Sequence, residues 1–312
     1  MTESTERDCF QRLVQRLEPQ SKLVRSWELK GGVSAQVTAL EIEQLDGKRR
    51  KVVVRRHGAA DIAQNPHVAA DEFKLMELLK SVGVAAPVPF FLDQSGEIFS
   101  TPYVVIEYIE GKTEFTPADV TDHVFQLAAQ LSRIHSVDVS KLDLSFLPKL
   151  EKACTEKIEK RPAITDESLG EGRIRDVLEA VWPFPSRNPC VLLHGDFWPG
   201  NVMWRDGQLA AVIDWEDAQL GDPLADVANA RLEILWAFGI EAMLRFTGRY
   251  QSLTKFDFTD LSYWDLFAAL RPASKISDWG LDASTEQKMR EEHSWFVAQA
   301  FEKIGTGKGK KS

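Results

Sequence analysis

Long apolar runs are missing from this chain of 312 residues, although 44% of its residues are hydrophobic. No stretch approaches the roughly 18 to 20 consecutive apolar residues that a membrane-spanning helix needs. The first residues, Met1 to Asp8, are polar and acidic, whereas an export signal begins with a basic stretch that leads into an apolar one. We therefore expect neither membrane insertion nor export.

Cysteine is scarce as well. The chain has three cysteines, Cys9, Cys154 and Cys190, which are odd in number and far apart. No close pair suggests a zinc site or a disulfide framework. A reducing, cytoplasmic location fits this pattern best.

The chain also lacks the excess of positive charge that general nucleic-acid binding needs, because its net charge is -9. Residues 1–110 are nearly balanced, with 14 Lys and Arg against 16 Asp and Glu. Residues 111–312 have 24 Lys and Arg against 31 Asp and Glu. Three of these basic residues are lysines within the last five residues, and without them the count is 21 against 31. Two interpretations remain open: a solvated acidic surface, or a pocket suited to a cationic substrate.

Residues 1–110 have the pattern of a small antiparallel sheet. Segments rich in β-branched or large apolar residues lie at 27–29, 33–42, 51–55, 90–93 and 103–108. Asp46-Gly47 is a hairpin signal. Helical periodicity covers residues 10–17 before the sheet and 66–82 within it. We expect an N-terminal lobe with one internal helix.

Residues 111–304 are mostly helical in pattern, and Thr116-Pro117 is predicted to cap the first helix. An apolar run at 191–193 and a hairpin around Asp206-Gly207 interrupt the helices. Residues 305–312 contain glycine and lysine and are predicted to form a disordered basic tail. The whole pattern predicts an α+β protein with two lobes, at 1–110 and 111–304.

The strongest chemical signal is His194-Gly195-Asp196, followed by Asn201 and, after the hairpin, by Asp214. A carboxylate such as Asp196, at the end of a strand-like run, can accept a proton from an attacking hydroxyl. The side chains of Asn201 and Asp214 can converge on a hard cation. Magnesium prefers such oxygen ligands and keeps coordination positions for water and phosphate oxygens. The pattern therefore predicts a site for a phosphoryl group.

This arrangement resembles the catalytic loop and the metal aspartate of protein kinases, with His-Gly-Asp for His-Arg-Asp and Asp-Trp-Glu for Asp-Phe-Gly. It is more closely similar to the aminoglycoside phosphotransferase and choline kinase-like family. The similarity continues through Gly-Asp-Pro-Leu-Ala-Asp-Val-Ala at residues 221–228. It implies a bilobal, protein-kinase-like fold in which Asp196 is the catalytic base and Asn201 and Asp214 bind magnesium.

Two further residues follow from the same resemblance. His194 would support the catalytic loop, as a buried histidine with satisfied hydrogen bonds. Asp226 is similar to the aspartate that braces this loop, and an ordinary carboxylate at a helix start is the alternative. The chain also resembles the kinase-like domain that is joined to some acyl-CoA dehydrogenases.

The predicted helix at 66–82 contains an inward-facing glutamate, Glu72. The residues three, four and seven positions beyond it are all apolar: Leu75, Met76 and Leu79. Breaking a buried ion pair costs about 3–5 kcal/mol, so Glu72 needs a cation, and Arg55 and Arg56 on the preceding strand are the candidates. In protein kinases a lysine fills this place and also touches the nucleotide phosphates. Several members of the resembled family have arginine, which implies Arg55.

Two other segments are candidates for nucleotide binding. The backbone N–H groups of the segment around Gly32 and Ser34 could cover the phosphates, and an ordinary turn is the alternative. The resemblance places Glu107 and Ile109 at the hinge whose backbone holds adenine, and a simple strand end is the alternative.

The sequence thus predicts transfer of the γ-phosphoryl group of ATP, or alternatively GTP, with Mg²⁺, to a hydroxyl of a small molecule. The acceptor is either aminoglycoside-like or a metabolic alcohol. Trp198, Trp215, Glu216 and Asp217 either line its site or serve in packing. Two alternatives are a non-catalytic nucleotide-binding regulatory protein and a metal-dependent phosphohydrolase. The oligomeric state stays open.

Overall fold

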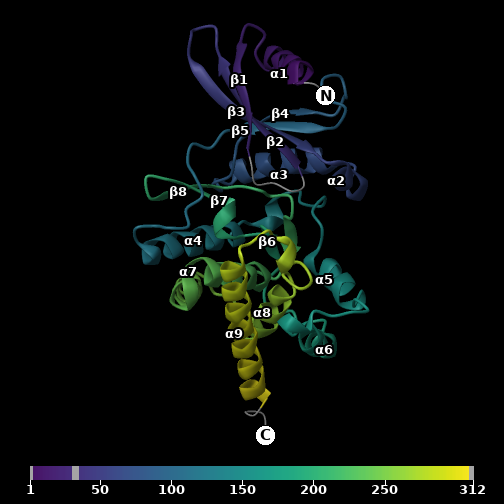
Figure 1. Ribbon diagram of the computed structural model, residues 1–312, viewed down its shortest axis with the longest axis vertical. Coiled ribbons are helices and arrows are strands. Elements are labelled where there is room, and N and C mark those ends of the chain that lie inside the picture. Colours follow the sequence, from purple (N-terminus) through teal and green to yellow (C-terminus); the bar gives the residue numbers. More distant parts are fainter. Residues whose placement is uncertain (1–2, 30–34, 309–312) are drawn as a thin grey trace. The chain divides into compact units, whose positions relative to one another are not determined.

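The computed structural model describes residues 3–29 and 35–308, which divide into two compact units (Figure 1). The first unit comprises Met1–Gly111 together with Ala210–Glu216, and the second comprises Lys112–Leu209 and Asp217–Ser312. The segment 210–216 thus groups with the first unit, whereas the sequence assigned it to the second lobe. Within the first unit, the backbone N–H of Val212 donates to the carbonyl oxygen of Ala85 at 2.8 Å.

The first unit is built around a five-stranded antiparallel sheet with the strand order β1-β2-β3-β5-β4. Its strands are β1 (Lys22–Glu28), β2 (Ala35–Glu43), β3 (Arg49–His57), β4 (Pro89–Asp93) and β5 (Tyr103–Glu107). The expected hairpin at Asp46-Gly47 joins β2 to β3, and Gly47 has φ +78, which glycine adopts without steric cost.

Helices cover both faces of this sheet. Successive residues of a strand point to opposite faces. Val105 belongs to the apolar cluster that contains Phe10 and Leu13 of α1 (Glu3–Leu17), whereas its neighbour Val104 packs with Met76 of α3 (Val68–Ser81). Besides these two predicted helices, the structure contains a short helix α2 (Ala59–Gln64) between β3 and α3.

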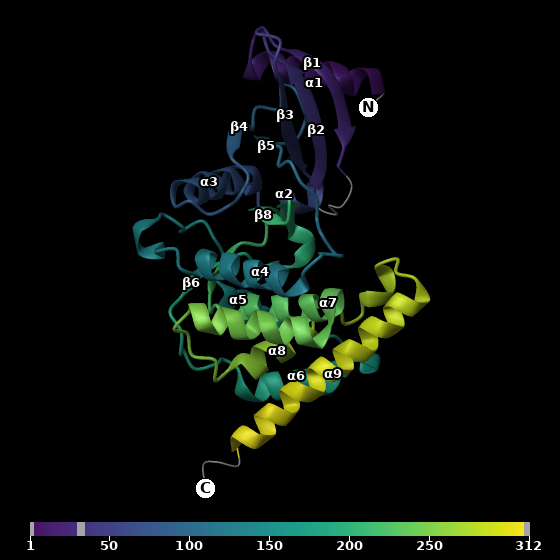
Figure 2. The same ribbon diagram turned by 90° about the vertical axis from the view of Figure 1, so that its left-hand side faces the viewer.

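The second unit is mainly helical. Its α-helices are α4 (Val120–His135), α5 (Leu150–Glu159), α6 (Glu171–Val181), α7 (Leu224–Leu253), α8 (Leu261–Ala269) and α9 (Ala283–Lys308). Its 3-10 helices are η1 (Val139–Lys141), η2 (Glu167–Leu169), η3 (Pro199–Asn201) and η4 (Ile276–Asp278). Helices α4 and α7 lie side by side (Figure 2), and the predicted apolar face of α4 is buried, with Val124 and Leu131 both fully covered.

The start of α4 differs from the sequence prediction. The cap is Asp119, whose side chain accepts a hydrogen bond of 3.0 Å from the backbone N–H of Asp122. Thr116 instead donates both its backbone N–H and its hydroxyl to the carboxylate of Glu114. A local turn thus uses the groups of Thr116 that would have started a helix.

Four short strands lie between α6 and α7, and the last of them but one, β8, runs into the segment 210–216 of the first unit. Strand β6 (Val191–Leu193) pairs antiparallel with β9 (Gln219–Gly221), and β7 (Val202–Arg205) forms a two-stranded sheet with β8 (Gln208–Val212). Both the apolar run at 191–193 and the hairpin around Asp206-Gly207 are therefore present as expected. Asp206 has φ +53, which aspartate tolerates better than most residues.

A buried ion pair lies between α7 and α8. The guanidinium of Arg231 donates Nε to Oδ1 of Asp265 at 2.9 Å and Nη2 to Oδ2 at 3.0 Å, and Nη1 donates to the Thr247 hydroxyl. Arg231 and Asp265 are 1% and 0% exposed. Both charges are removed from water and depend on each other.

The C-terminal region is more helical than the sequence suggested. Residues 305–308, assigned to the tail, continue α9, and residues 309–312 lie outside the described part. The 22 preceding residues of that helix offset the low helix propensity of Gly305 and Gly307. Among the described helices, none has both the length and the hydropathy of a membrane-spanning segment.

Candidate active site

The loop that follows β6 needs a glycine at its centre. Gly195 has φ +81, and a Cβ atom added there would overlap the backbone carbonyl oxygen of Asp217 and lie 2.7 Å from its carbonyl carbon. Both the backbone angle and the close approach exclude a larger side chain. This glycine places His194 and Asp196 on either side of a tight bend.

Asp226, near the start of α7, fixes the backbone of this loop. Its two carboxylate oxygens accept hydrogen bonds from the backbone N–H groups of His194, at 2.7 Å, and Gly195, at 2.9 Å. Burial opposes ionisation of Asp226, but interactions with His135 and His194 outweigh it and lower the pKa of the carboxyl. The geometry is that of a loop brace, the first of the two interpretations of Asp226.

His194 is fully buried, and its ring Nδ1 accepts a hydrogen bond from the backbone N–H of Asp196 at 3.2 Å. This hydrogen bond fixes the peptide that carries the Asp196 side chain. This agrees with a supporting histidine.

Asp196 and Asn201 lie together. The Asn201 amide nitrogen donates to the backbone oxygen of Asp196 at 2.9 Å and to its Oδ2 at 3.1 Å. With the nitrogen engaged in this way, Oδ1 of Asn201 remains as an oxygen acceptor. A hard cation takes such an oxygen as a ligand, so the donor set of Asn201 fits magnesium.

The Asp196 carboxylate has a second partner that the sequence did not indicate. Arg271, two residues beyond α8, forms an ion pair with Oδ1 of Asp196 and donates Nη1 to the backbone oxygen of Gly195 at 3.2 Å. Glu233 of α7 faces the same charges: burial raises the pKa of its carboxyl to about 7, with Asp196 adding to the rise and Arg271 opposing it.

In the first unit, Arg55 is surrounded by carboxylates. Its guanidinium lies 3.3 Å from Glu72 and 2.9 Å from Asp214, and it forms an ion pair with Glu216. Burial disfavours the charge of Arg55, but these carboxylates outweigh it and raise its pKa. The expected ion pair with Glu72 is present, and Glu72 is buried as predicted.

The adjacent arginine, Arg56, serves a different purpose. Its guanidinium forms an ion pair with Glu6 at 2.6 Å and lies over the rings of Phe10 and Phe99. Adjacent strand residues point to opposite faces, so Arg56 joins α1 to the sheet while Arg55 meets Glu72 on the other side.

Asp214 follows β8 with φ +64, a left-handed conformation that is uncommon outside glycine. Its Oδ1 is buried and has no hydrogen bond of good geometry among the described residues, although the charge of Arg55 lies nearby. A buried carboxylate oxygen in this state fits a metal ligand. The predicted trio is thus divided between the units, with Asp196 and Asn201 in the second and Asp214 in the first.

Four predicted nucleotide-binding residues remain. Gly32 and Ser34 lie outside the described residues. Glu107 is the last residue of β5, where its backbone N–H donates to the carbonyl oxygen of Val88 at 2.8 Å, and Ile109 follows two residues later. Glu107 also pairs with Val52 of β3, and this position at the end of a strand is compatible with either interpretation of the segment.

The aromatic residue of the Asp-Trp-Glu motif belongs to the core. Trp215 is 2% exposed, and its indole N–H donates to the backbone oxygen of Val212 at 2.9 Å. Trp198 remains partly exposed and packs near Phe115, with ring centroids 6.2 Å apart. Packing is therefore the role of Trp215, while Trp198 keeps a solvent-accessible surface.

Within residues 3–29 and 35–308, no group of three or more His, Cys, Asp or Glu side chains is arranged to hold a metal ion. A hydrolase whose metal is held by protein side chains alone needs such a cluster. A magnesium ion shared with phosphate oxygens needs only one or two carboxylate or amide ligands from the protein.

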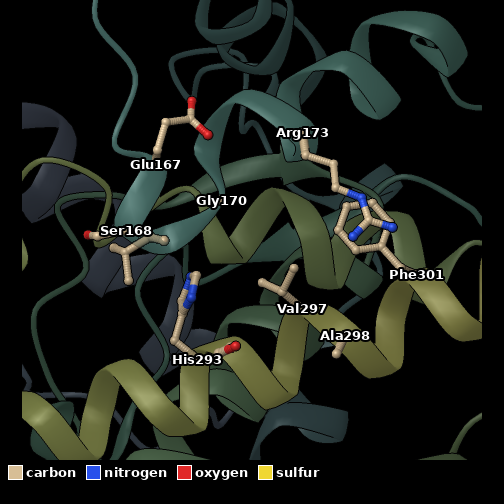
Figure 3. A pocket seen from close by; sticks show the side chains of 10 residues that line it. Glu167, Ser168, Gly170, Arg173, His293, Val297, Ala298 and Phe301 are labelled. Atoms are coloured by element: carbon tan, nitrogen blue, oxygen red, sulfur yellow. The ribbon is translucent and has the colours of Figure 1, made fainter.

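A separate pocket of about 280 Å³ lies between η2, the start of α6 and α9 (Figure 3). Ser168, Arg173, His293 and Phe301 are among its lining residues, and the guanidinium of Arg173 lies 3.9 Å from the ring centroid of Phe301. None of the predicted site residues lines it, so we keep it apart from the site around Asp196.

Sequence similarity agrees with the geometry. The model of the phosphotransferase enzyme family matches residues 28–295. The chain belongs to this family. Mouse acyl-CoA dehydrogenase family member 10 is 29% identical over 199 residues, which cover 59% of this chain and only 18% of that protein.

Solved structures share the fold at low identity. A macrolide 2'-phosphotransferase from Brachybacterium faecium aligns with a TM-score of 0.63 and 18% identity over 93% of this chain and 98% of its own. The GDP complex of aminoglycoside 2'-phosphotransferase-IIIa gives a TM-score of 0.63 and 17% identity over the same shares of the two chains. The protein therefore has the α+β, kinase-like fold that the sequence predicted.

Sequence reasoning missed four residues of the site: His57, His135, Glu233 and Arg271. His57 approaches Glu72, with Nε2 to Oε2 at 2.9 Å, and it lies two positions after Arg55 on β3. The two-residue period of a strand could have found it. His135, which approaches Asp226 at 3.2 Å, has no local signal of this kind.

Proposed function

We propose that this phosphotransferase moves the γ-phosphoryl group of ATP, with GTP as the alternative donor, to a hydroxyl of a small molecule. The observation that carries the proposal is the state of Asn201. Its amide nitrogen fixes the Asp196 carboxylate, and its carbonyl oxygen remains available to a cation. GDP in a structural neighbour supports testing both nucleotides.

Asp196 would orient the acceptor hydroxyl and accept its proton. The hydroxyl oxygen forms a bond to the γ-phosphorus, while the bond from that phosphorus to the bridging oxygen breaks and its electrons leave with the nucleoside diphosphate. The brace from Asp226 keeps the loop in one conformation, so the carboxylate needs little reorganisation.

Arg55 would contact the nucleotide phosphates. Glu72 fixes the Arg55 guanidinium from the α3 side, and Glu216 and Asp214 from the β8 side. A planar guanidinium can serve carboxylate and phosphate together. Asn201 and Asp214 would supply oxygen ligands to magnesium, which when bound neutralises charge on the phosphates. The main-chain groups around Gly32, Ser34, Glu107 and Ile109 are proposed as further nucleotide contacts.

The test uses purified protein with ATP or GTP, magnesium and pooled metabolites, read by mass spectrometry for a phosphorylated alcohol. Asp196→Asn should lower turnover by about 100-fold or more, because general base catalysis supplies a factor of this order. Asp206→Asn is the matched control, since it removes the same charge from an exposed turn and should keep full activity.

Other outcomes separate the alternatives. Phosphate release without any acceptor, unchanged by Arg55→Met, would indicate the hydrolase. Tight nucleotide binding without transfer to any pooled metabolite would indicate the regulatory module. Near-normal turnover of Asp196→Asn would refute the assignment of the base.

A further inference from the structure

Arg271 forms an unexpected contact for a residue next to a proposed base. A general base works by taking a proton, and a guanidinium paired with it favours the charged, unprotonated carboxylate. In this structure Arg271 contacts both Asp196 and the carbonyl oxygen of Gly195. The side chain of Arg271 is 36% exposed, so the pair is open to an incoming molecule.

A second cation lies close to Arg271 without a carboxylate of its own. Lys157 of α5 places its ammonium group 5.2 Å from the ring centroid of Phe267, which belongs to α8 just before Arg271. Within the described residues, Lys157 takes part in no ion pair, and its side chain is only partly exposed. Burial, together with the positive charges of Arg271, Lys275 and Arg175, lowers the pKa of Lys157 to about 8.

Of the three cations Arg175, Arg271 and Lys157, two are paired with carboxylates. Arg175 is neutralised by Glu171, with Nε to Oε1 at 2.8 Å. Asp196 balances Arg271. Glu233 of α7 lies near Arg271 and Asp196, and burial raises the pKa of its carboxyl to about 7. Lys157 therefore remains without a paired carboxylate among the described residues.

The cations near Lys157 contrast with the acidic composition of residues 111–312. Residues 111–312 have 31 Asp and Glu against 24 Lys and Arg, yet Arg271, the partner of Asp196, lies in a group of cations with Lys157, Lys275 and Arg175. Arg271 and Lys157 therefore do not favour a cationic acceptor. An aminoglycoside, which carries several ammonium groups, would meet Arg271 and Lys157 as like charges.

We infer that the acceptor is an alcohol that carries its own oxyanion, a carboxylate or a phosphate, and that Arg271 and Lys157 bind this anion. The anion replaces Asp196 as the partner of Arg271, and the freed carboxylate then accepts the proton of the acceptor hydroxyl. This inference rests on the proposed function, because it assigns the acceptor of the same transfer reaction. The exchange also makes the reaction selective for anionic acceptors, since only an anion replaces Asp196 as the partner of Arg271.

The first experiment separates the inference from the proposed function. Pooled metabolites are divided on an anion-exchange column, and each fraction is incubated with the protein, ATP and magnesium. A phosphorylated alcohol that arises from the retained, anionic fraction supports the inference. A product that arises only from the unbound fraction overturns it while the proposed function stands. No product from either fraction counts against both.

The same experiment identifies the anion. Treating the retained fraction with a phosphatase before the assay removes monoester phosphates and leaves carboxylates. Loss of the product then assigns a phosphate monoester to the acceptor, and persistence assigns a carboxylate. Both results keep the oxyanion, and they decide which form Arg271 and Lys157 recognise.

Variants test the two cations directly. With the acceptor found in this way, Arg271→Met and Lys157→Met should each raise KM for the acceptor about tenfold or more, the usual scale for losing a charge-assisted hydrogen bond. KM for ATP should not change. Arg245→Met is the matched control, because in the described part of the chain Arg245 pairs only with Glu241, on an exposed turn of α7.

An esterified, neutral form of the acceptor completes the test. It should be a poor substrate of the wild-type protein, and Arg271→Met should narrow the difference between ester and anion. An unchanged KM for the anion in both Met variants, each shown to be folded by its thermal unfolding, would refute the inference. If Arg271→Met does not fold, Lys157→Met and the ester comparison still decide.

Discussion

Glu233 gives the folded protein a stability that falls as pH rises. The pKa of its carboxyl is raised from 4.5 to about 7, mainly by burial. The folded state therefore binds more protons than the unfolded chain between these two values, and stability is lost across this window as pH rises. At about 1.4 kcal/mol per pH unit, the full effect is roughly 3 kcal/mol. Because the side chain keeps some solvent contact, we expect about 1–3 kcal/mol.

The substitution Glu233→Gln removes the ionisable group and keeps its shape. The quantity to compare is the difference in unfolding free energy between this variant and the wild-type protein. This difference should be about 1–3 kcal/mol more favourable to the variant at pH 8 than at pH 4.5. The measurement is urea-induced unfolding followed by tryptophan fluorescence at several pH values. Glu241→Gln is the control, because Glu241 lies on the same helix with a side chain that is 78% exposed.

The gain in unfolding free energy distinguishes a desolvated Glu233 carboxyl from one that ionises as it does in water. If Glu233→Gln and Glu241→Gln show the same pH dependence, the Glu233 carboxyl ionises as it does in water. An ionised Glu233 would then add a negative charge near Arg271 and Asp196. The argument that Glu233 is desolvated beside Asp196 would be refuted.

Three other substitutions test the framework of the second unit. Asp265→Asn leaves Arg231 buried with no full counter-charge and should lower the unfolding free energy by about 3–5 kcal/mol in urea titrations; a loss below about 1 kcal/mol would contradict the buried pair. Gly195→Ala should cost at least about 1–2 kcal/mol from the left-handed backbone and abolish transfer activity, since the loop must move; wild-type activity would contradict it. Asp226→Asn should cost about 1–3 kcal/mol by removing one acceptor from the loop. Because the pKa of Asp226 is lowered in the folded protein, this contribution should be present near neutral pH and disappear below about pH 4 in the wild-type protein.

The sequence predicted those parts of the fold that depend on local pattern. The strands on either side of Asp46-Gly47, the apolar face of α4 and the inward position of Glu72 all follow from period and turn chemistry, and the structure contains each of them. Helix starts were less predictable. Thr116-Pro117 has the composition of a helix start, but Glu114 binds Thr116, and Asp119 is left to cap the helix.

The site was predictable where its residues share one short segment. His194, Asp196 and Asn201 lie within eight residues, so their spacing alone limits their geometry. The choice between Arg55 and Arg56 was not fixed by spacing, because a shift of one residue reverses the face of a strand. Only the register of β3, with Arg56 directed to Glu6, settles which guanidinium meets Glu72.

The charges around Asp196 show why composition could not identify the acceptor. Lys157 lies on α5, Glu233 on α7 and Arg271 beyond α8, so more than 110 residues separate the first from the last. A charge count over the whole lobe averages these residues with its solvated acidic surface. What matters to a ligand is the local field, and burial shifts the members of this group individually, because it raises the pKa of Glu233 and lowers that of Lys157. The acceptor of a related chain is therefore better inferred from the residues that fill these three positions than from its net charge.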